Sequence, residues 1–331
     1  MISIIIPVYN KARYLDQCLS SLSKIKTDDW ECLLIDDGST DDSPVICDHW
    51  AETDCRFRVI HQQNAGVSIA RNLGINLARG GWIYFLDADD CCINPSFNLE
   101  KNCDAHAIFG TFLDGKSLVS PLRKNIFSID NFAFAYLRGD LRGRIGSFFV
   151  KRAFLNENNL LFAPGCRYGE DLSFILRLLV YSRKTVFEDN VFCHYKQNPT
   201  SVSRDFTLAK FDVFFERLHL IDDLSDSDNY PVVDYLKAFS LIQAIVDPAR
   251  DLLRNGMSSI LLKRFLMDNK DILFELRCAY KRKSLSIKYR IPAWLLLHCP
   301  IVYKCFLVLQ NAWYESRAFL GKTKRLLLCR E

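Results

Sequence analysis

The chain opens with Ile2-Ser-Ile-Ile-Ile-Pro-Val-Tyr9, a stretch that is almost continuously apolar and rich in β-branched residues. A short run of this kind is typical of a strand that is buried on both faces of a parallel sheet. The segment that follows, residues 14–22, carries its apolar residues at the spacing of an amphipathic helix. The N-terminus therefore predicts a strand followed by a helix.

The same alternation continues as far as residue 90. We expect strands at 30–35, 57–60 and 81–86, separated by helices at 43–50 and 67–78. Strands that alternate with helices predict an α/β fold, in which a mostly parallel sheet is built through right-handed crossovers. Ligands of such sheets bind at the carboxyl ends of the strands, so we expect the functional site there.

The pattern is less regular from about residue 91 to residue 150, and it becomes mostly helical from residue 208 onward. We expect two further strands, at 145–150 and 186–194, and a helix that begins near Glu170. In the later part of the chain we expect helices at 211–220, 235–246 and 260–266. The sequence therefore predicts an α/β domain over residues 1–205 and a mostly helical region over residues 206–331.

The composition is that of a globular protein, because apolar residues make up 49% of the 331 residues and charged residues 25%. The net charge of +4 is unevenly spread: residues 278–331 contain eleven Lys and Arg but only two Asp and Glu. A basic, aromatic tail on an acidic body suggests that the tail contacts an anionic surface. Since the body is acidic and no recognised nucleic-acid-binding motif occurs, we expect no nucleic-acid partner.

The thirteen cysteines occur at irregular spacings, and no CxxC motif is present. Disulfide frameworks and zinc sites are regularly patterned, so we expect reduced thiols in a cytoplasmic protein. We expect no signal peptide, because the first residues lack a basic region and carry a strand pattern instead.

Carboxylates follow two of the predicted strands. Asp37 comes after the second strand, and Asp87, Asp89 and Asp90 come after the fourth. Crowded like charges are unfavourable unless a cation lies among them, and carboxylates at i and i+2 can face one site on a turn. Oxygen ligands suit Mg²⁺ or Mn²⁺, which commonly bridge to phosphate oxygens. The alternative is that these residues only cap helices and turns, an interpretation we favour for Asp41, Asp42 and Asp90.

Four short motifs follow one another along the first part of the chain. They are Ser3-Ile-Ile-Ile-Pro-Val-Tyr-Asn10, Leu34-Ile-Asp-Asp-Gly-Ser39, Asn64-Ala-Gly-Val-Ser-Ile-Ala-Arg-Asn72 and Phe85-Leu-Asp-Ala-Asp-Asp90. In this order they resemble the signature of family 2 glycosyltransferases with the GT-A fold. Two later segments, 168–174 and 194–203, resemble acceptor-side motifs of the branch that makes bacterial capsule and O-antigen polysaccharides.

The resemblance implies a GT-A domain over residues 1–205, with a nucleotide-binding half at 1–95 and an acceptor-side half at 96–205. It implies an inverting, metal-dependent glycosyltransferase that uses Mn²⁺ or Mg²⁺. The donor would be a nucleotide-sugar, with UDP the favoured nucleotide. The acceptor would be a hydroxyl group of a glycan, for which we favour a lipid-linked oligosaccharide at the cytoplasmic face of the inner membrane.

The resemblance also implies roles for individual residues. Asp171 would be the catalytic base, with Glu170 as its neighbour or substitute. Asp89 would hold the metal against the diphosphate, with Asp87 and His194 as further metal contacts. The residues that would bind the nucleotide-sugar are Pro7, Tyr9, Asn10, Asp37, Asn64, Gly66, Arg71 and Asp87.

Other interpretations stay open for the acceptor-side residues. Glu170 and Asp171 could be ordinary acids of a first helical turn, where the helix dipole lowers basicity while a like-charged neighbour raises it. His194 could be a half-buried histidine without a functional role. For the whole chain, the alternative to an enzyme is a catalytically inactive GT-A-fold protein that binds sugar or nucleotide, or serves as a scaffold of a polysaccharide assembly complex. A dinucleotide-dependent dehydrogenase is excluded, because no G-x-G-x-x-G follows the first strand.

The C-terminal tail also leaves two alternatives. Basic residues lie near Trp294 and Trp313, which is typical of an amphipathic segment at a membrane interface. The other possibility is a helical subdomain that packs on the body. His298, Pro300 and Lys304 interrupt the apolar segments, so we expect no transmembrane helix.

Overall fold

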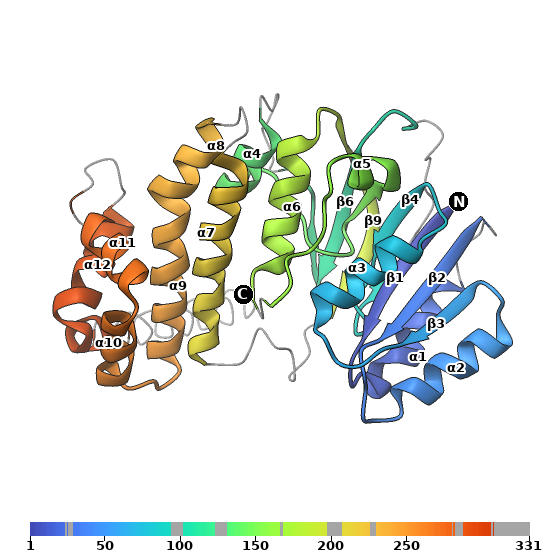
Figure 1. Ribbon diagram of the computed structural model, residues 1–331, viewed down its shortest axis with the longest axis horizontal. Helices are drawn as coiled ribbons and strands as arrows, with labels where there is room; N and C mark the ends of the chain where they lie inside the picture. Colours follow the sequence, from blue (N-terminus) through green and yellow to red (C-terminus); the bar gives the residue numbers. More distant parts are fainter. Residues whose placement is uncertain are drawn as a thin grey trace, which may run out of the picture. The chain divides into compact units, whose positions relative to one another are not determined.

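The computed structural model (Figure 1) describes residues 1–23, 25, 29–93, 102–122, 131–165, 168–196, 207–225, 230–279, 281, 287–305 and 307. By its internal contacts the chain divides into two compact units, residues 1–204 and residues 205–331. In the described residues, the first unit is a mixed sheet with helices on its faces, and the second unit is made of helices.

Four parallel strands form one half of the sheet, in the order β3-β2-β1-β4. Strand β1 lies between β2 and β4, so its apolar residues are covered on both sides, and five of its seven residues are at most 4% exposed and aliphatic. The four strands are β1 (Ile2–Val8), β2 (Trp30–Asp36), β3 (Phe57–His61) and β4 (Trp82–Phe85). The predicted α/β pattern of this part of the chain is confirmed.

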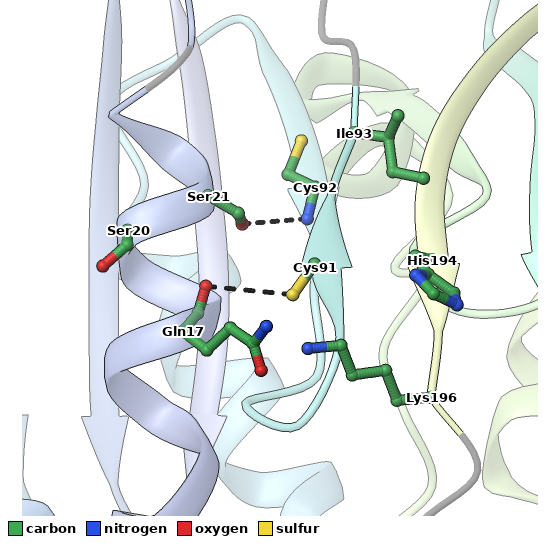
Figure 2. A pocket seen from close by; sticks show the side chains of 8 residues that line it. All are labelled: Gln17, Ser20, Ser21, Cys91, Cys92, Ile93, His194 and Lys196. Atoms are coloured by element: carbon green, nitrogen blue, oxygen red, sulfur yellow. Dashed lines mark hydrogen bonds between the residues drawn. The ribbon is translucent and has the colours of Figure 1, made fainter. Parts of the chain in front are cut away.

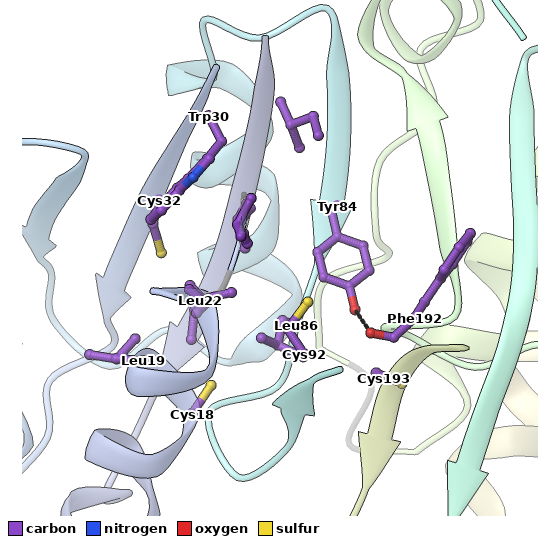
Figure 3. Packing of buried hydrophobic residues seen from close by; sticks show 14 of the residues in the cluster. Cys18, Leu19, Leu22, Trp30, Cys32, Tyr84, Leu86, Cys92, Phe192 and Cys193 are labelled. Atoms are coloured by element: carbon purple, nitrogen blue, oxygen red, sulfur yellow. Dashed lines mark hydrogen bonds between the residues drawn. The ribbon is translucent and has the colours of Figure 1, made fainter. Parts of the chain in front are cut away.

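Helices cover both faces of this parallel half. Helix α1 (Ala12–Leu22) packs beside α2 (Ser43–Thr53), and Cys18 and Leu19 of α1 join a core cluster with the even-numbered residues of β1 (Figure 3). Helix α3 (Val67–Leu77) packs against β1 and β2. Its Gly74 allows the close approach, because a Cβ there would lie 2.4 Å from Cγ2 of Ile5.

The second half of the sheet is not parallel throughout. Strand β8 (Phe148–Lys151) runs antiparallel to β4, and β6 (Ala107–Asp114) runs antiparallel to β8. Strand β9 (Thr185–Tyr195) pairs with β6 in parallel, and the two-residue β5 (Cys91–Cys92) pairs with β9. Among the described residues the full order is β3-β2-β1-β4-β8-β6-β9-β5, with β7 (Ser117–Val119) paired to β6.

The predicted strands at 145–150 and 186–194 correspond to β8 and β9, but β6 was not predicted. It contains Gly110, a residue that is unfavourable in a strand. The structure explains the glycine, because a Cβ at this position would lie 2.5 Å from the ring of Phe192 in β9. The close packing of these two strands therefore requires a residue without a side chain.

Helix α6 (Glu170–Tyr181) begins where the sequence predicts it, directly after Gly169, whose φ is +90°. An aromatic stack fixes the helix to the end of β4. The rings of Phe162 and Phe174 lie 3.9 Å apart and parallel, and the ring of Phe85 meets Phe162 edge-on at 5.2 Å. The first turn of α6 is thereby held near the carboxyl end of β4. Helices α4 (Phe132–Arg138) and α5 (Arg152–Glu157) complete the unit.

The second unit consists of helices in the described residues, as predicted. Helix α9 is its centre, since it contacts α7, α11 and α12. A π-helical turn (Leu236–Ser240) precedes α9 and divides the helix predicted at 235–246. The helices are α7 (Asp212–Ser225), α8 (Tyr230–Tyr235), α9 (Leu241–Arg254), α10 (Ser259–Asp268), α11 (Lys270–Ala279) and α12 (Ile287–His298), after a 3-10 turn at Leu208–Phe211.

No helix within the described ranges has both the length and the apolar character needed to cross a bilayer. Most of the predicted interfacial tail lies outside the described residues, since only 281, 287–305 and 307 are described beyond residue 279.

Candidate active site

The loops after β1 and β2 are bound to each other through Asn10. This residue adopts a left-handed conformation with φ +52°. Its backbone N–H donates to Oγ of Ser39 at 3.1 Å, and its side-chain Oδ1 accepts from the N–H of Thr40 at 2.8 Å. Next to it, Tyr9 is an exposed aromatic residue, with 47% of its surface accessible. Pro7 lies within β1 itself.

Asp37 joins the predicted nucleotide-binding residues of two motifs, although through contacts within the protein. Its Oδ1 accepts from the side chain of Gln62 at 2.6 Å and from the N–H of Ala65 at 2.8 Å, and its Oδ2 accepts from the N–H of Gly66 at 2.9 Å. The side chain of Asn64 donates to the Asp37 carbonyl at 2.9 Å. The buried Asp37 carboxylate therefore shapes the loop that carries Asn64 and Gly66.

Arg71 lies at the centre of an ion-pair cluster that joins distant parts of the first unit. Its Nη2 donates to Oδ1 of Asp87 at 2.9 Å, and its Nη1 donates to Oδ1 of Asp171 at 2.6 Å and approaches Oε1 of Glu170 at 3.5 Å. The Arg71 side chain is only 3% exposed, and its guanidinium lies 5.0 Å from the centre of the Phe162 ring. The cluster therefore connects the predicted donor-side residue Asp87 with the predicted base.

The environment shifts the pKa values within this cluster. Burial raises the pKa of Glu170 to about 7, and the neighbouring charge of Asp171 adds to the rise. Burial also raises the pKa of Asp171, against the opposing effect of Arg71. Burial alone would lower the pKa of Arg71, but Asp171, Asp87 and Glu170 outweigh it and raise that pKa. Because 40% of the Asp171 side chain is exposed, a ligand can reach this carboxylate although Arg71 holds it.

The turn after β4 carries the predicted metal ligands. Its backbone is closed by the N–H of Asp90, which donates to the carbonyl of Asp87 at 2.9 Å. Oδ2 of Asp89 lies 2.5 Å from Nζ of Lys11, and Oδ1 of Asp90 accepts from the backbone N–H of Lys196 at 2.9 Å. Burial, together with the charge of Asp87, raises the pKa of Asp90 to about 8. Asp90 is therefore an internal structural group of the turn.

His194 does not join the carboxylates of this turn in one ligand set. Its Nε2 lies 2.9 Å from the carbonyl of Gly115, and its backbone pairs with Cys91 in the sheet. Its ring lines a pocket of about 350 Å³ between α1, β5 and β9 (Figure 2). No carboxylate of the cluster lines this pocket, whose residues are Gln17, Ser20, Ser21, Cys91, Cys92, Ile93, His194 and Lys196.

The oxygens of the turn fit a hard divalent cation that is shared with phosphate. Asp89 contacts Lys11 through Oδ2 and Asp87 contacts Arg71 through Oδ1, while no described residue donates to the second oxygen of either carboxylate. Mg²⁺ is usually held by one or two protein carboxylates together with water and substrate phosphates. Within the part of the chain that the structure describes, no three His, Cys, Asp or Glu side chains form a metal site by themselves. The protein thus offers part of a coordination sphere.

Two residues that bind predicted site residues were not themselves predicted: Lys11 contacts Asp89 and Gln62 contacts Asp37. The contact of the Lys196 N–H with Asp90, the structural neighbour of Asp89, was not predicted either. Lys11 carried a signal, since it is a cation directly after the motif that ends in Asn10. Gln62 and Lys196 carried none, because their roles depend on how two loops are placed.

The sequence comparisons find similarity to glycosyltransferases. Residues 3–100 match the family model described as glycosyl transferase family 2. The chain is 30% identical over 216 residues to the uncharacterized glycosyltransferase EpsJ of Bacillus subtilis, and the aligned region covers 61% of this chain and 63% of EpsJ. It is 27% identical over 229 residues to the glycosyltransferase GlyG of Streptococcus pneumoniae, which covers 63% of this chain and 75% of GlyG. The match to EpsJ thus spans less than two thirds of that relative.

The fold also resembles that of solved structures. The crystal structure of residues 1–349 of Staphylococcus aureus TarS, in complex with UDP-GlcNAc, superposes with a TM-score of 0.62 at 18% identity. The superposition covers 86% of this chain and 93% of the TarS chain. A likeness at this identity concerns the fold, and it agrees with the predicted GT-A architecture with a helical C-terminal region.

Proposed function

We propose that this chain, whose residues 3–100 belong to glycosyl transferase family 2, transfers a sugar from a nucleotide-sugar to a hydroxyl group of a glycan during polysaccharide synthesis. The observation that carries the proposal is the position of Arg71. This buried side chain binds Asp87, which lies in the donor half after β4, and Asp171, which lies in the first turn of α6 in the other half. Residues that bind the donor and residues that activate the acceptor must lie at one site for the reaction to occur.

The nucleotide would lie at the carboxyl ends of β1 and β2. Tyr9 offers an exposed ring for the base, and Asn10 holds the two loops together. Asp37 binds the loop that carries Asn64 and Gly66, and this loop would lie beside the nucleotide. We favour UDP as the nucleotide, and the solved TarS complex with UDP-GlcNAc supports this choice through its similar fold.

Asp171 would act as the base that accepts the proton of the attacking hydroxyl group. General-base catalysis needs a carboxylate within reach of that proton, and Asp171 is the more exposed acid of the pair, at 40% against 14% for Glu170. A raised pKa strengthens a carboxylate as a proton acceptor, and the proton that Glu170 retains up to about pH 7 limits repulsion between the two. Attack from the face opposite the nucleotide would invert the anomeric centre.

Asp89, assisted by Asp87, would hold Mn²⁺ or Mg²⁺ beside the diphosphate. The cation would neutralise the charge that develops on the departing nucleotide diphosphate. Arg71 would stay paired with Asp87 and Asp171 and hold their carboxylates in place during the reaction.

We further propose that residues 1–205 are the catalytic domain and that residues 206–331 form a separate helical region. A lipid-linked oligosaccharide is the acceptor we favour, on the basic charge of the tail. The enzyme would then act at the cytoplasmic face of the inner membrane, where anionic lipids attract basic segments.

A panel of nucleotide-sugars, each with and without Mn²⁺, tests the donor. The unfolding temperature of the full chain should rise when one UDP-sugar and Mn²⁺ are present together, because a ligand of the native state stabilises it by mass action. The Asp89→Ala variant should lose the Mn²⁺-dependent part of that shift. Release of UDP in the presence of a lipid-linked acceptor should then establish turnover. Binding without any turnover would support the non-catalytic alternative, and no shift with any nucleotide-sugar would refute the proposal.

A further inference from the structure

Lys11 is a cation at the candidate metal site to which no motif assigns a role. Its Nζ lies 2.5 Å from Oδ2 of Asp89, and the two side chains are 28% and 17% exposed. The two residues are 78 positions apart, on the loops after β1 and β4. The ammonium group therefore occupies one side of the carboxylate that would hold the divalent cation.

The backbone of Lys11 is anchored, so that only its side chain can leave Asp89. Its N–H donates to Oγ of Ser43 at 2.8 Å, and its carbonyl accepts from the N–H groups of Tyr14 and Leu15 at the start of α1. The next N–H, that of Ala12, donates to Oδ2 of Asp41 at 3.0 Å. Since a flexible four-carbon stem carries the ammonium, it can turn to another anion without any change in the fold.

The charges around Asp89 make this ammonium a competitor of a metal ion. Among the described residues, the basic side chain that pairs with Asp89 is that of Lys11, while Arg71 pairs with Asp87 and Asp171. A divalent cation bound to Asp89 would repel the ammonium at short range, because like charges in a site disfavour each other. A nucleotide diphosphate would remove the conflict, since it supplies new negative charge for both cations.

We propose that Lys11 is a built-in counter-ion that holds Asp89 until a nucleotide diphosphate binds, and that its ammonium then moves to the diphosphate. Lys11 thereby makes the binding of the divalent cation depend on the nucleotide, and free cation binds weakly. By linkage the dependence is reciprocal, so the cation strengthens nucleotide binding by the same factor. This inference rests on the proposed function, because it takes a nucleotide diphosphate as the ligand.

Calorimetric titration of Mn²⁺ into the full chain, with and without UDP, tests the proposal. Without UDP, the Lys11→Met variant should bind Mn²⁺ about tenfold more tightly than the wild type, because a positive charge has been removed next to a doubly charged ion. UDP should strengthen Mn²⁺ binding by a large factor in the wild type and by a smaller factor in Lys11→Met. The Lys11→Arg variant, which keeps the charge, should retain weak binding of free Mn²⁺.

A matched control removes a lysine from an ion pair elsewhere in the same unit. Lys184 pairs with Asp104 at the surface, at the opposite end of β9 from His194, and Lys184→Met should leave both Mn²⁺ affinities unchanged. If Lys11→Met binds free Mn²⁺ no more tightly than the wild type and shows the same UDP enhancement, the counter-ion role is refuted while the proposed function stands. If UDP and Mn²⁺ bind neither to the wild type nor to Lys11→Met, both the counter-ion role and the proposed function are refuted.

Discussion

Nη1 of Arg71 lies 2.6 Å from Oδ1 of Asp171, one hundred residues further along the chain. The same guanidinium binds Asp87 through Nη2. This one buried side chain thus fixes the position of two carboxylates that belong to different motifs. In the structure Arg71 pairs with these carboxylates and neutralises them, and its contact with a nucleotide-sugar, which the family motif implies, stays a prediction.

Replacement of Arg71 by Met should destabilise the first unit. Three carboxylates would lose their counter-ion, and we expect the free energy of unfolding to fall by about 3 kcal/mol. This value is at the low end of the range for a broken buried ion pair, because Asp87 and Asp171 are partly exposed. Chemical denaturation measures this change. The exposed pair between Arg264 and Asp268 offers a control, since Arg264→Met should cost less than about 0.5 kcal/mol. Equal effects of the two variants would contradict the structural role of Arg71.

Asp171→Asn should separate catalysis from donor binding. Asn can still accept a hydrogen bond from Arg71, but it cannot accept the proton of the acceptor hydroxyl, so we expect turnover to fall about 10²–10⁴-fold. The affinity for the nucleotide-sugar, measured by calorimetry, should change little. Glu170→Gln should reduce turnover much less. The reverse order of the two variants would make Glu170 the base, and a parallel loss of donor affinity would make Asp171 a binding residue.

In the metal-free protein, Asp90 should lower the stability of the fold as the pH rises towards 8. The folded state raises the pKa of Asp90 from 3.8 to about 8, so it holds a proton that the unfolded chain releases at lower pH. The contribution of Asp90 to the free energy of unfolding therefore decreases between about pH 4 and pH 8 and is constant above that range. Asp90→Asn removes this contribution and keeps an oxygen for the Lys196 N–H.

Thermal unfolding of both proteins in EDTA at several pH values measures the difference. We expect similar stability near pH 4 and a growing advantage of Asp90→Asn up to pH 8. Glu170, with a pKa raised to about 7, should leave a smaller slope of the same sign in the variant. Parallel pH profiles of the two proteins would show that Asp90 is not protonated in the fold.

Gly110→Ala should destabilise the strand pair β6–β9. A Cβ at residue 110 would lie 2.5 Å from the buried ring of Phe192, and overpacking of this kind typically costs about 1–3 kcal/mol. The control is Gly81→Ala, where a Cβ would meet nothing within 4 Å and the backbone φ is not in the left-handed region. Chemical denaturation of both variants measures the costs, and an unchanged stability of Gly110→Ala would mean that the ring can move aside.

The sequence by itself predicted the parallel half of the sheet. Buried β-branched runs and helical spacing are local patterns, and they marked β1 to β4 and the helices between them within a few residues. Because parallel strands end at one edge, the sequence also indicated which polar residues gather there. The acids at the start of α6 were identified by their motif, and the structure brings them within reach of Arg71.

Only the tertiary structure decided how the mixed half is built and which partner each charged group takes. Strand β6 has a glycine in its middle because the ring of Phe192 fills the space of a side chain there, and no local sequence pattern reveals this contact. Asp37 binds the loop at 62–66, Arg71 binds carboxylates, and Lys11 binds Asp89. The physical reason is the same in each case: these contacts depend on which groups lie close together in space, and the separation of two residues along the chain does not predict that distance.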